Sequence, residues 1–163
     1  MATVRRLSET DATDFRAIRL EALQRHPEAF AATYADEAAQ PLAFFSGRLK
    51  SGAVFGGFQG PTLLGVAGFY RLAQEKVRHK GVLYGMYVRD PARGTGLAGQ
   101  LVDAVLAHAR REVELVQLSV VASNDAARRL YERCGFERYG VEPRALKVDG
   151  RYLDEALMVK RLD

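Results

Sequence analysis

The segment VRDPARGTGLA, residues 88–98, joins two different patterns and decides the fold. The apolar run before it, residues 82–88, predicts a strand, and the stretch after it predicts a helix. The helical spacing is carried by Leu97, Leu101, Val102, Val105 and Leu106. The glycines of residues 88–98 therefore lie in a turn at a helix N-terminus, where unpaired amides and the helix dipole favour the binding of an anion. Glycine also leaves the backbone open to close approach by a ligand.

Two common nucleotide-binding patterns fit this turn poorly. The Walker pattern is absent, because no Gly-Lys-Ser/Thr follows the glycines. Gly94, Gly96 and Gly99 do satisfy Gly-x-Gly-x-x-Gly, but five residues separate the strand from the first of them. The next predicted strand, residues 115–121, also lacks the acidic residue that a dinucleotide site needs at its end. A glycine-rich helix start that binds no ligand remains an alternative.

A second pattern, residues 121–136, places an asparagine and a tyrosine seven positions apart. Seven steps of ~100° make nearly two turns, so Asn124 and Tyr131 share one helix face with Ala127 between them. Such a face suits a narrow ligand, since the alanine leaves room, the asparagine can bond an amide and the tyrosine presents a hydroxyl. The alternative is that Asn124 is an ordinary helix cap and Tyr131 a packing residue.

Taken together, the two patterns resemble the GNAT superfamily of N-acyltransferases. Arg93, Gly96 and Ala98 match its signature Arg/Gln-x-x-Gly-x-Gly/Ala, and the order strand, Asn, helix, Tyr, Gly-Phe resembles the second half of its core. The motifs cover residues 82–136, and the order of elements extends the likeness to the whole chain. The resemblance implies acetyl-CoA as co-substrate, with no metal. Its diphosphate would be held by the backbone of Arg93, Gly94, Thr95, Gly96, Leu97 and Ala98.

The resemblance also implies roles for other residues. Asn124 and Ala127 would meet the pantetheine arm, and backbone amides near Met86 and Val88 would contact the thioester. Tyr131 would act as the general acid that protonates the departing thiolate. The implied reaction is direct attack by a primary amine of an unidentified acceptor in a ternary complex. The alternative is a non-catalytic acyl-CoA-binding or sensing module.

A general base is missing from the strand where many relatives of this superfamily carry one. Alternation places Val82, Tyr84 and Met86 on one face of that strand, and none of them is a base. Three carboxylates nearer the N-terminus could act through a water, but each is expected to be an ordinary solvated side chain. These are Glu21, Glu28 and Glu37.

Several other polar residues have a structural interpretation. We expect His26 to end its helix, where a cation is favoured, and His79 to lie on the surface. Cys134 is expected to be a small buried apolar residue rather than a nucleophile. The 3′-phosphate of CoA would be bound by Arg93 or by one of three arginines of the tyrosine-bearing helix. The sequence does not rank these candidates. The three arginines are Arg128, Arg129 and Arg133.

The remaining chain predicts an α+β (mixed α/β) fold of order βααβββαβαββ in one domain, residues 1–163. Hairpins mixed with helix-connected strands imply a mixed sheet covered by helices on both faces. The strands are predicted at residues 3–7, 53–58, 62–70, 82–88, 115–121, 136–147 and 151–161, and the helices start near Ser8, Pro41, Gly96 and Asn124. Candidates for the acceptor pocket are Phe30, Tyr34, Tyr70, Tyr84 and the terminal hairpin, which could also join two subunits in a homodimer.

Composition limits the function classes. The 163 residues carry 24 basic and 20 acidic side chains, and the arginines are spread along the chain, which does not favour nucleic acid as a partner. The single cysteine excludes an internal disulfide and a multi-cysteine zinc site, so a reducing compartment fits. No window has the apolar length of a signal peptide or membrane span. We therefore expect a cytoplasmic protein.

Overall fold

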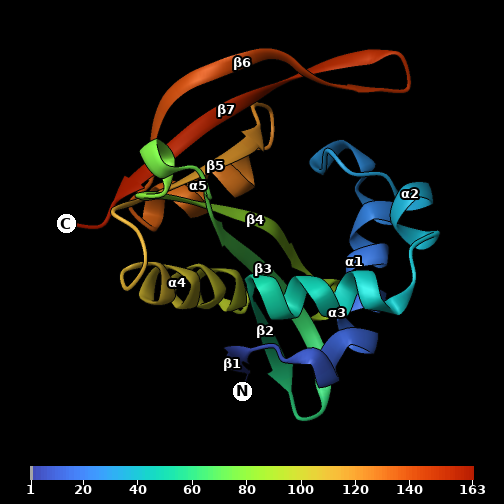
Figure 1. Cartoon of the computed structure of the whole chain (residues 1–163). Coiled ribbons are helices and arrows are strands. Elements are labelled where there is room, and N and C mark those ends of the chain that lie inside the picture. The colour runs from blue at the N-terminus through green and yellow to red at the C-terminus, as the bar shows by residue number, and fades with distance from the viewer. Residues whose placement is uncertain (1) are drawn as a thin grey trace.

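The computed structural model describes residues 2–163, which form a seven-stranded sheet with helices on both faces (Figure 1). The strand order is β1-β2-β3-β4-β5-β7-β6. The strands are β1 (Thr3–Arg6), β2 (Ala53–Gln59), β3 (Thr62–Arg71), β4 (Lys80–Val88), β5 (Leu115–Val121), β6 (Glu137–Val148) and β7 (Arg151–Arg161). The helices are α1 (Ala12–Arg25), α2 (Tyr34–Ala38), α3 (Leu42–Ser51), α4 (Leu97–Ala109) and α5 (Asp125–Arg133).

The predicted mixed α/β fold is confirmed, with one helix added. The sequence patterns missed α2, which has five residues and follows Thr33, whose hydroxyl accepts a hydrogen bond from the amide of Asp36 at 3.1 Å. So short a helix shows no apolar periodicity, and isolated helices of this length are unstable without tertiary contacts. The element order is therefore βαααβββαβαββ.

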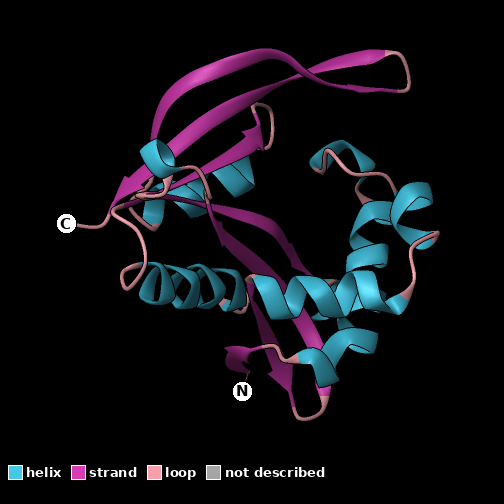
Figure 2. Ribbon diagram, in the orientation of Figure 1, coloured by secondary structure: helices cyan, strands magenta, loops and turns pink. Residues whose placement is uncertain are grey.

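Two hydrophobic cores lie on opposite faces of the sheet. Helices α1 and α3 cover one face, where Phe15, Ile18 and Phe45 are buried against β2 and β3. Helices α4 and α5 contribute residues to the core on the other face. Figure 2 shows these layers of helices and strands. The β6–β7 hairpin forms one edge of the sheet and extends beyond it toward the α1–α2 end of the molecule (Figure 1).

Helix α4 lies close to the sheet because two glycines face it. A Cβ on Gly57 of β2 would come within 2.4 Å of the side chain of Leu97, and one on Gly65 of β3 within 3.0 Å of Leu101. Real Cβ atoms essentially never show the approach at Gly57, and the one at Gly65 is tighter than most real contacts, so a larger residue at either position would press on the helix. The first turn of α4 therefore owes its position to small residues on the strands beneath it.

Strands β4 and β5 separate in the middle of the sheet. They are parallel neighbours, but their pairing is limited to Lys80–Val82 against Leu115–Gln117. Beyond these residues β4 continues beside β3, and β5 continues beside β7, without pairing to each other. Because α4 leads from the end of β4, its N-terminus lies at the open end of this separation.

A β-bulge interrupts β4 at the same level. Ala67 of β3 stands opposite two residues, Gly85 and Met86, and Gly85 has a φ of +66°, as expected for the glycine of a G1 bulge. The extra residue reverses the alternation of the side chains that follow. Met86 therefore packs with the core of α4, whereas Tyr84 lies toward α1 and α3, near Arg19 and Arg48. The prediction that Tyr84 and Met86 share one face was wrong.

An ion cluster joins the three N-terminal helices. Glu37 of α2 accepts hydrogen bonds from Nε and Nη2 of Arg19 in α1, at 3.0 and 3.1 Å, and from both Nη atoms of Arg48 in α3, at 3.3 Å. Glu37 is only 4% exposed, so the expectation of a solvated carboxylate was wrong. Burial raises the pKa of Glu37, but the bonds and charges of the two arginines outweigh it and hold that pKa below its usual value.

Replacing Glu37 by glutamine tests this cluster. Glu37→Gln leaves two arginines without their counter-charge, and we expect the free energy of unfolding in urea to fall by about 3 kcal/mol at pH 7. A lowered pKa contributes stability above the unfolded-state pKa, and this contribution is lost as pH falls below about 4. The variant should therefore approach the wild type in stability under acid conditions.

Glu28→Gln is the matched control, because Glu28 carries the same group with a half-exposed side chain. We expect its unfolding free energy to stay within about 0.5 kcal/mol of the wild type. A Glu37→Gln chain as stable as this control at pH 7 would contradict the structural role of the cluster.

Candidate functional site

A cavity of about 880 Å³ lies where β4 and β5 separate. Its walls come from the loop after α1, the second half of β4, the start of α4 and one face of α5. The residues that line it are His26, Glu28, Ala29, Phe30, Met86, Tyr87, Val88, Ala92, Arg93, Gly94, Gly96, Leu97, Ala98, Gly99, Val121, Ser123, Asn124, Ala126, Ala127, Leu130, Arg133 and Cys134. The two sequence patterns thus meet across one space.

The turn before α4 presents unpaired backbone amides to this cavity. Gly94 and Gly96 have φ angles of +76° and +87°, which L-residues rarely adopt, and Gly96 is the N-cap. Within residues 2–163 no protein carbonyl accepts from the amides of Gly94 or Gly96, and those of the first helical turn have no partner inside the helix. A Cβ at Gly94, Gly96 or Gly99 would meet no atom within 4 Å, so the space above these amides is open.

Two amides of the predicted segment bond to the protein itself. The amide of Arg93 donates to the carbonyl of Asp90 at 3.1 Å, and that of Thr95 donates to the carbonyl of Ala92 at 3.4 Å. Thr95 also bonds Ala92 through its hydroxyl and does not line the cavity. The amides that are free for an anion are therefore those of the glycines and of Leu97 and Ala98.

The face that α5 turns to the cavity includes two of the predicted residues. Asn124 is the helix cap, since its Oδ1 accepts from the amide of Ala127 at 3.2 Å, and both residues line the cavity. The capping interpretation and the ligand interpretation are compatible, because the cap uses the oxygen and leaves the side-chain NH₂ group as a donor. Ala127 adds little side-chain bulk to this wall.

Tyr131 lies deeper than the other predicted residues. It is 6% exposed, its ring packs edge-on against Phe136 at 5.9 Å, and it is not part of the cavity lining. Burial, with a smaller contribution from Cys134, raises the pKa of its phenol far above the usual value. No fully buried side-chain oxygen within residues 2–163 lacks a hydrogen-bond partner, and no described residue bonds the Tyr131 hydroxyl. The oxygen itself is therefore not sealed inside the protein.

Cys134 lines the cavity one helical turn after Leu130. Burial raises the pKa of its thiol, with Asp103 adding to the effect. A raised pKa keeps the thiol neutral and lowers its nucleophilicity. The cysteine therefore supplies a polarizable wall to the cavity, as a small half-buried residue.

The loop after α1 closes one side of the cavity, and among its residues the sequence had offered only Phe30 as a candidate for the acceptor pocket. His26, Glu28 and Phe30 all line the cavity. The Nε2 atom of His26 lies 3.2 Å from a guanidinium nitrogen of Arg93, and its ring packs 5.8 Å from that of Tyr87. The expectation that His26 only ends its helix was incomplete, because the chain turns at Pro27 and brings the imidazole to the start of α4.

The structure ranks the arginines of α5. Arg133 lines the cavity, whereas Arg128 donates to the carbonyl of Ala122 at 3.0 Å and pairs with Asp125. Arg129 is exposed and is not part of the lining. A cation for an anionic ligand is therefore available from Arg93 on one wall and from Arg133 on another.

The carboxylates near the cavity are held by other side chains. Glu21 accepts a hydrogen bond from the hydroxyl of Tyr87 at 2.7 Å and pairs with Arg89 at 3.2 Å. Burial and the Glu21 carboxylate raise the pKa of Tyr87 to about 12. Neither Glu21 nor Glu37 lines the cavity, and Glu28, which does, has a half-exposed side chain beside His26.

Neither a membrane-spanning helix nor a cluster of metal ligands is present among residues 2–163. No helix within residues 2–163 is both long and apolar enough to cross a membrane. No group of three or more His, Cys, Asp or Glu residues in the same range is arranged to hold a metal ion. The cavity described above is lined by backbone amides, cationic side chains and apolar walls.

Comparison with known proteins places this geometry in a family. The model of the acetyltransferase (GNAT) family matches residues 8–136, which span both walls of the cavity. The chain belongs to the acetyltransferase (GNAT) family. The resemblance inferred from residues 82–136 is thereby confirmed.

Two curated relatives are named as acetyltransferases of different kinds. An L-methionine sulfoximine/L-methionine sulfone acetyltransferase of Pseudomonas paraeruginosa is 39% identical over 83 residues, which cover 50% of this chain. The matched segment spans 48% of that relative, about half of its length. The N-alpha-acetyltransferase RimI of Mycobacterium tuberculosis is 32% identical over 151 residues, covering 88% of this chain and 90% of the relative.

A solved GNAT structure shows the same fold throughout. The protein yncA of Salmonella typhimurium, determined with acetyl-CoA, aligns with a TM-score of 0.84 over 100% of this chain and 95% of its own. The two sequences are 23% identical, so the likeness is one of fold. The overall arrangement of helices and strands is thus shared with this structure.

Gly96→Ala tests whether the open space above the amides receives a diphosphate. The new Cβ enters that space, and a φ of +87° adds strain of about 1 kcal/mol to the fold. We expect calorimetry with coenzyme A to show binding weakened about tenfold or more, or about 1.4 kcal/mol.

Gly60→Ala is the matched control. Gly60 has a φ of +57° and equally open surroundings, but it lies in the β2–β3 turn away from the cavity. It should share the loss of stability and retain the affinity for coenzyme A. Equal affinity of the two variants would show that the glycine turn does not approach the ligand.

Proposed function

We propose that the protein is an acetyl-CoA-dependent N-acetyltransferase that acts on a primary amine. The observation that carries this proposal is the row of unpaired amides at the start of α4, which faces a cavity between separated strands. A helix N-terminus with free amides and glycines suits a diphosphate, and Arg93 and Arg133 add positive charge on two walls. Family membership supports the same function.

The cavity suits the remaining length of the co-substrate. Acetyl-CoA supplies the acetyl group as a thioester at the end of a pantetheine arm. Asn124 can donate to an amide of that arm from its free NH₂ group, and Ala127 leaves room for the arm beside α5. The bulge at Gly85 and Met86 leaves backbone groups of β4 outside the regular ladder, where an amide can polarise the thioester carbonyl.

The reaction we propose is direct attack by the amine. A neutral amine forms a bond to the thioester carbonyl carbon, the carbon–sulfur bond breaks, and the thiolate takes a proton from Tyr131. The attacking nitrogen loses its extra proton to solvent water, and Tyr131 is reprotonated from the same solvent. Holding the two reactants in attack geometry can contribute ~7 kcal/mol or more, so positioning carries most of the rate. Burial raises the pKa of the Tyr131 phenol, which keeps it protonated at neutral pH but makes it a weaker acid than the thiol. Donation is therefore favourable only where the site stabilises the thiolate poorly.

Tyr131→Phe tests the general acid. The substitution removes only the hydroxyl and retains the packing on Phe136, so we expect kcat to fall about 10²-fold while KM for acetyl-CoA stays similar. Steady-state kinetics at saturating acetyl-CoA measure both constants. Tyr139→Phe, at an exposed tyrosine of β6, is the control and should leave kcat unchanged. A Tyr131→Phe enzyme with full kcat would remove this residue from the mechanism.

A second candidate function is a non-catalytic acyl-CoA-binding module. It is favoured by the half of β4 that faces the cavity, where Met86 and Val88 offer no base. The two functions differ in thiol release from acetyl-CoA with a panel of amines. We expect release above background with at least one amine, whereas the binding module would bind coenzyme A and release none.

The proposal extends to the assembly and surroundings of the chain. We propose a single catalytic domain in the cytoplasm, where one free cysteine is compatible with a reducing environment. We also propose a homodimer formed through the β6–β7 hairpin, whose outer strand exposes Tyr139 and whose partner strand exposes Tyr152, each by about half. Light scattering at micromolar concentration should give twice the chain mass, and a monomeric mass would contradict the dimer.

A further inference from the structure

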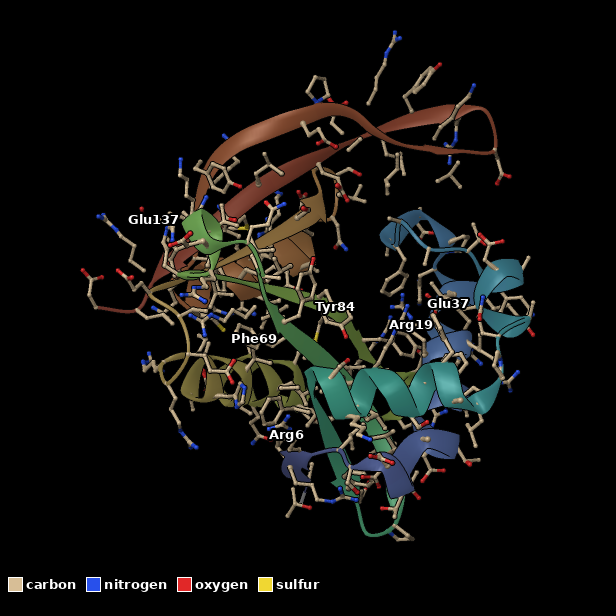
Figure 3. The ribbon with its side chains drawn as sticks, in the orientation of Figure 1. Arg6, Arg19, Glu37, Phe69, Tyr84 and Glu137 are labelled. Atoms are coloured by element: carbon tan, nitrogen blue, oxygen red, sulfur yellow. The ribbon has the colours of Figure 1, made fainter. Side chains whose placement is uncertain are left out.

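The two curated relatives are, by name, acetyltransferases of different kinds. The ion cluster of α1, α2 and α3 bears on the kind of acceptor that this chain takes. The cluster contains two arginines, Arg19 and Arg48, and one carboxylate, Glu37, which leaves an excess of one positive charge. The groups that act electrostatically on nearby Tyr84 are these three and Tyr70, so the excess charge lies beside β4. In Figure 3, Arg19 and Glu37 point toward one another from neighbouring helices, with Tyr84 projecting from β4.

Arg19 has donors that the cluster does not use. Glu37 takes its Nε and Nη2 groups, and no described residue accepts a hydrogen bond from Nη1. Although Arg19 as a whole is only 8% exposed, its Nη1 atom is not among the fully buried atoms that lack a hydrogen-bond partner. The two N–H groups of Nη1 therefore reach accessible space from a guanidinium whose orientation is fixed by a bidentate ion pair.

The free Nη1 group lies at the bulge of β4. It is 3.5 Å from the position that a Cβ on Gly85 would occupy, and Gly85 precedes Met86 of the cavity wall. The guanidinium of Arg19 also stacks on Phe30, another wall residue, at 5.3 Å from the ring centre. Arg19 is thus a cation beside the place where, under the proposed function, the thioester and the attacking amine meet.

We propose that Arg19, with the excess charge supplied by Arg48, binds a carboxylate on the carbon next to the reactive amine of the acceptor. This assignment rests on the proposed function and names its substrate class as a free α-amino acid or a close analogue. In such a molecule the carboxylate carbon lies only two bonds, ~2.5 Å, from the amine nitrogen. An anion that close to the nucleophile matches a cation at the bulge, and a protein N-terminus has an uncharged amide there instead.

Tyr84 adds a neutral donor to this site. Burial raises the pKa of its phenol, which keeps the hydroxyl protonated. Its ring packs over Gly68 of β3, where a Cβ would come within 2.6 Å of it, and against Tyr70 at 5.4 Å. The hydroxyl can therefore donate to a carboxylate held by Arg19 without itself acting as a base.

The test compares amino acids with their C-terminal amides in the thiol-release assay with acetyl-CoA. Amidation removes the carboxylate and lowers the pKa of the α-amine, so intrinsic reactivity alone favours the amide. We expect the free acids to be preferred in kcat/KM by about tenfold or more, chiefly through KM. Equal or better use of the amides would overturn the inference and would indicate a peptide N-terminus as acceptor, while the acetyltransferase function would stand.

Two variants, a test and its control, examine the role of the excess positive charge of the cluster. Arg48→Gln removes the excess positive charge and leaves the Arg19–Glu37 pair, and we expect the ratio of acid to amide kcat/KM to fall about fivefold or more. Arg16→Gln removes one charge from the same region of α1, where Arg16 donates to the carbonyl of Ala38, and should leave the ratio unchanged. Because each ratio is measured within one variant, a loss of stability cancels.

The outcomes separate this inference from the proposed function. An equal change of the ratio in both variants, or none in Arg48→Gln, would overturn the role of the cluster. Coenzyme A binding without thiol release, whether amino acids, their amides or the panel of other amines are supplied, would overturn the proposed function and this inference with it. Thiol release with other amines only would overturn this inference and leave the proposed function standing. Acid preference that depends on Arg48 supports both.

Discussion

The separation of β4 from β5 beyond Val82 is the constraint on which the rest of the site depends. Parallel strands normally continue side by side, yet here each keeps a different antiparallel neighbour while three residue pairs hold the two together. The gap leaves backbone groups of a central strand without strand partners, and buried backbone groups need a partner. Under the proposed function, the amides of the pantetheine arm would satisfy that requirement. The opening in the sheet therefore defines a binding site before any catalytic side chain is considered.

The position of α4 follows from its packing against β2 and β3. Gly57 and Gly65 let Leu97 and Leu101 approach the strands, so the first turn of the helix sits at the open end of the gap. The glycines before the helix then provide the conformations and the free amides at that point. Anion binding and helix packing thus depend on small residues in two different parts of the chain, which a local motif does not reveal.

The sequence could predict what depends on local patterns. The periodicity of apolar residues predicted most strands and the two helices beside the cavity. The glycine motif that ends in Ala98 predicted the turn before α4. The missed features depend on contacts between distant segments. Helix α2 is fixed through Glu37, whose two arginine partners lie 18 and 11 residues away. The bulge at Gly85 becomes visible only when β4 is aligned with β3. An isolated glycine within a strand pattern was its one local signal.

The bulge also gives one strand two chemically different surfaces. In a regular strand Tyr84, Met86 and Val88 would project to one face, and the cavity and the arginine cluster would compete for them. The extra residue reverses the alternation, so Met86 and Val88 turn toward the core of α4 while Tyr84 remains beside Arg19. Two surfaces of different chemistry therefore meet at Gly85: one is suited to a thioester and its diphosphate, the other to an anionic acceptor. Transfer between two bound molecules requires such a junction, because each must be held by groups that the other does not need.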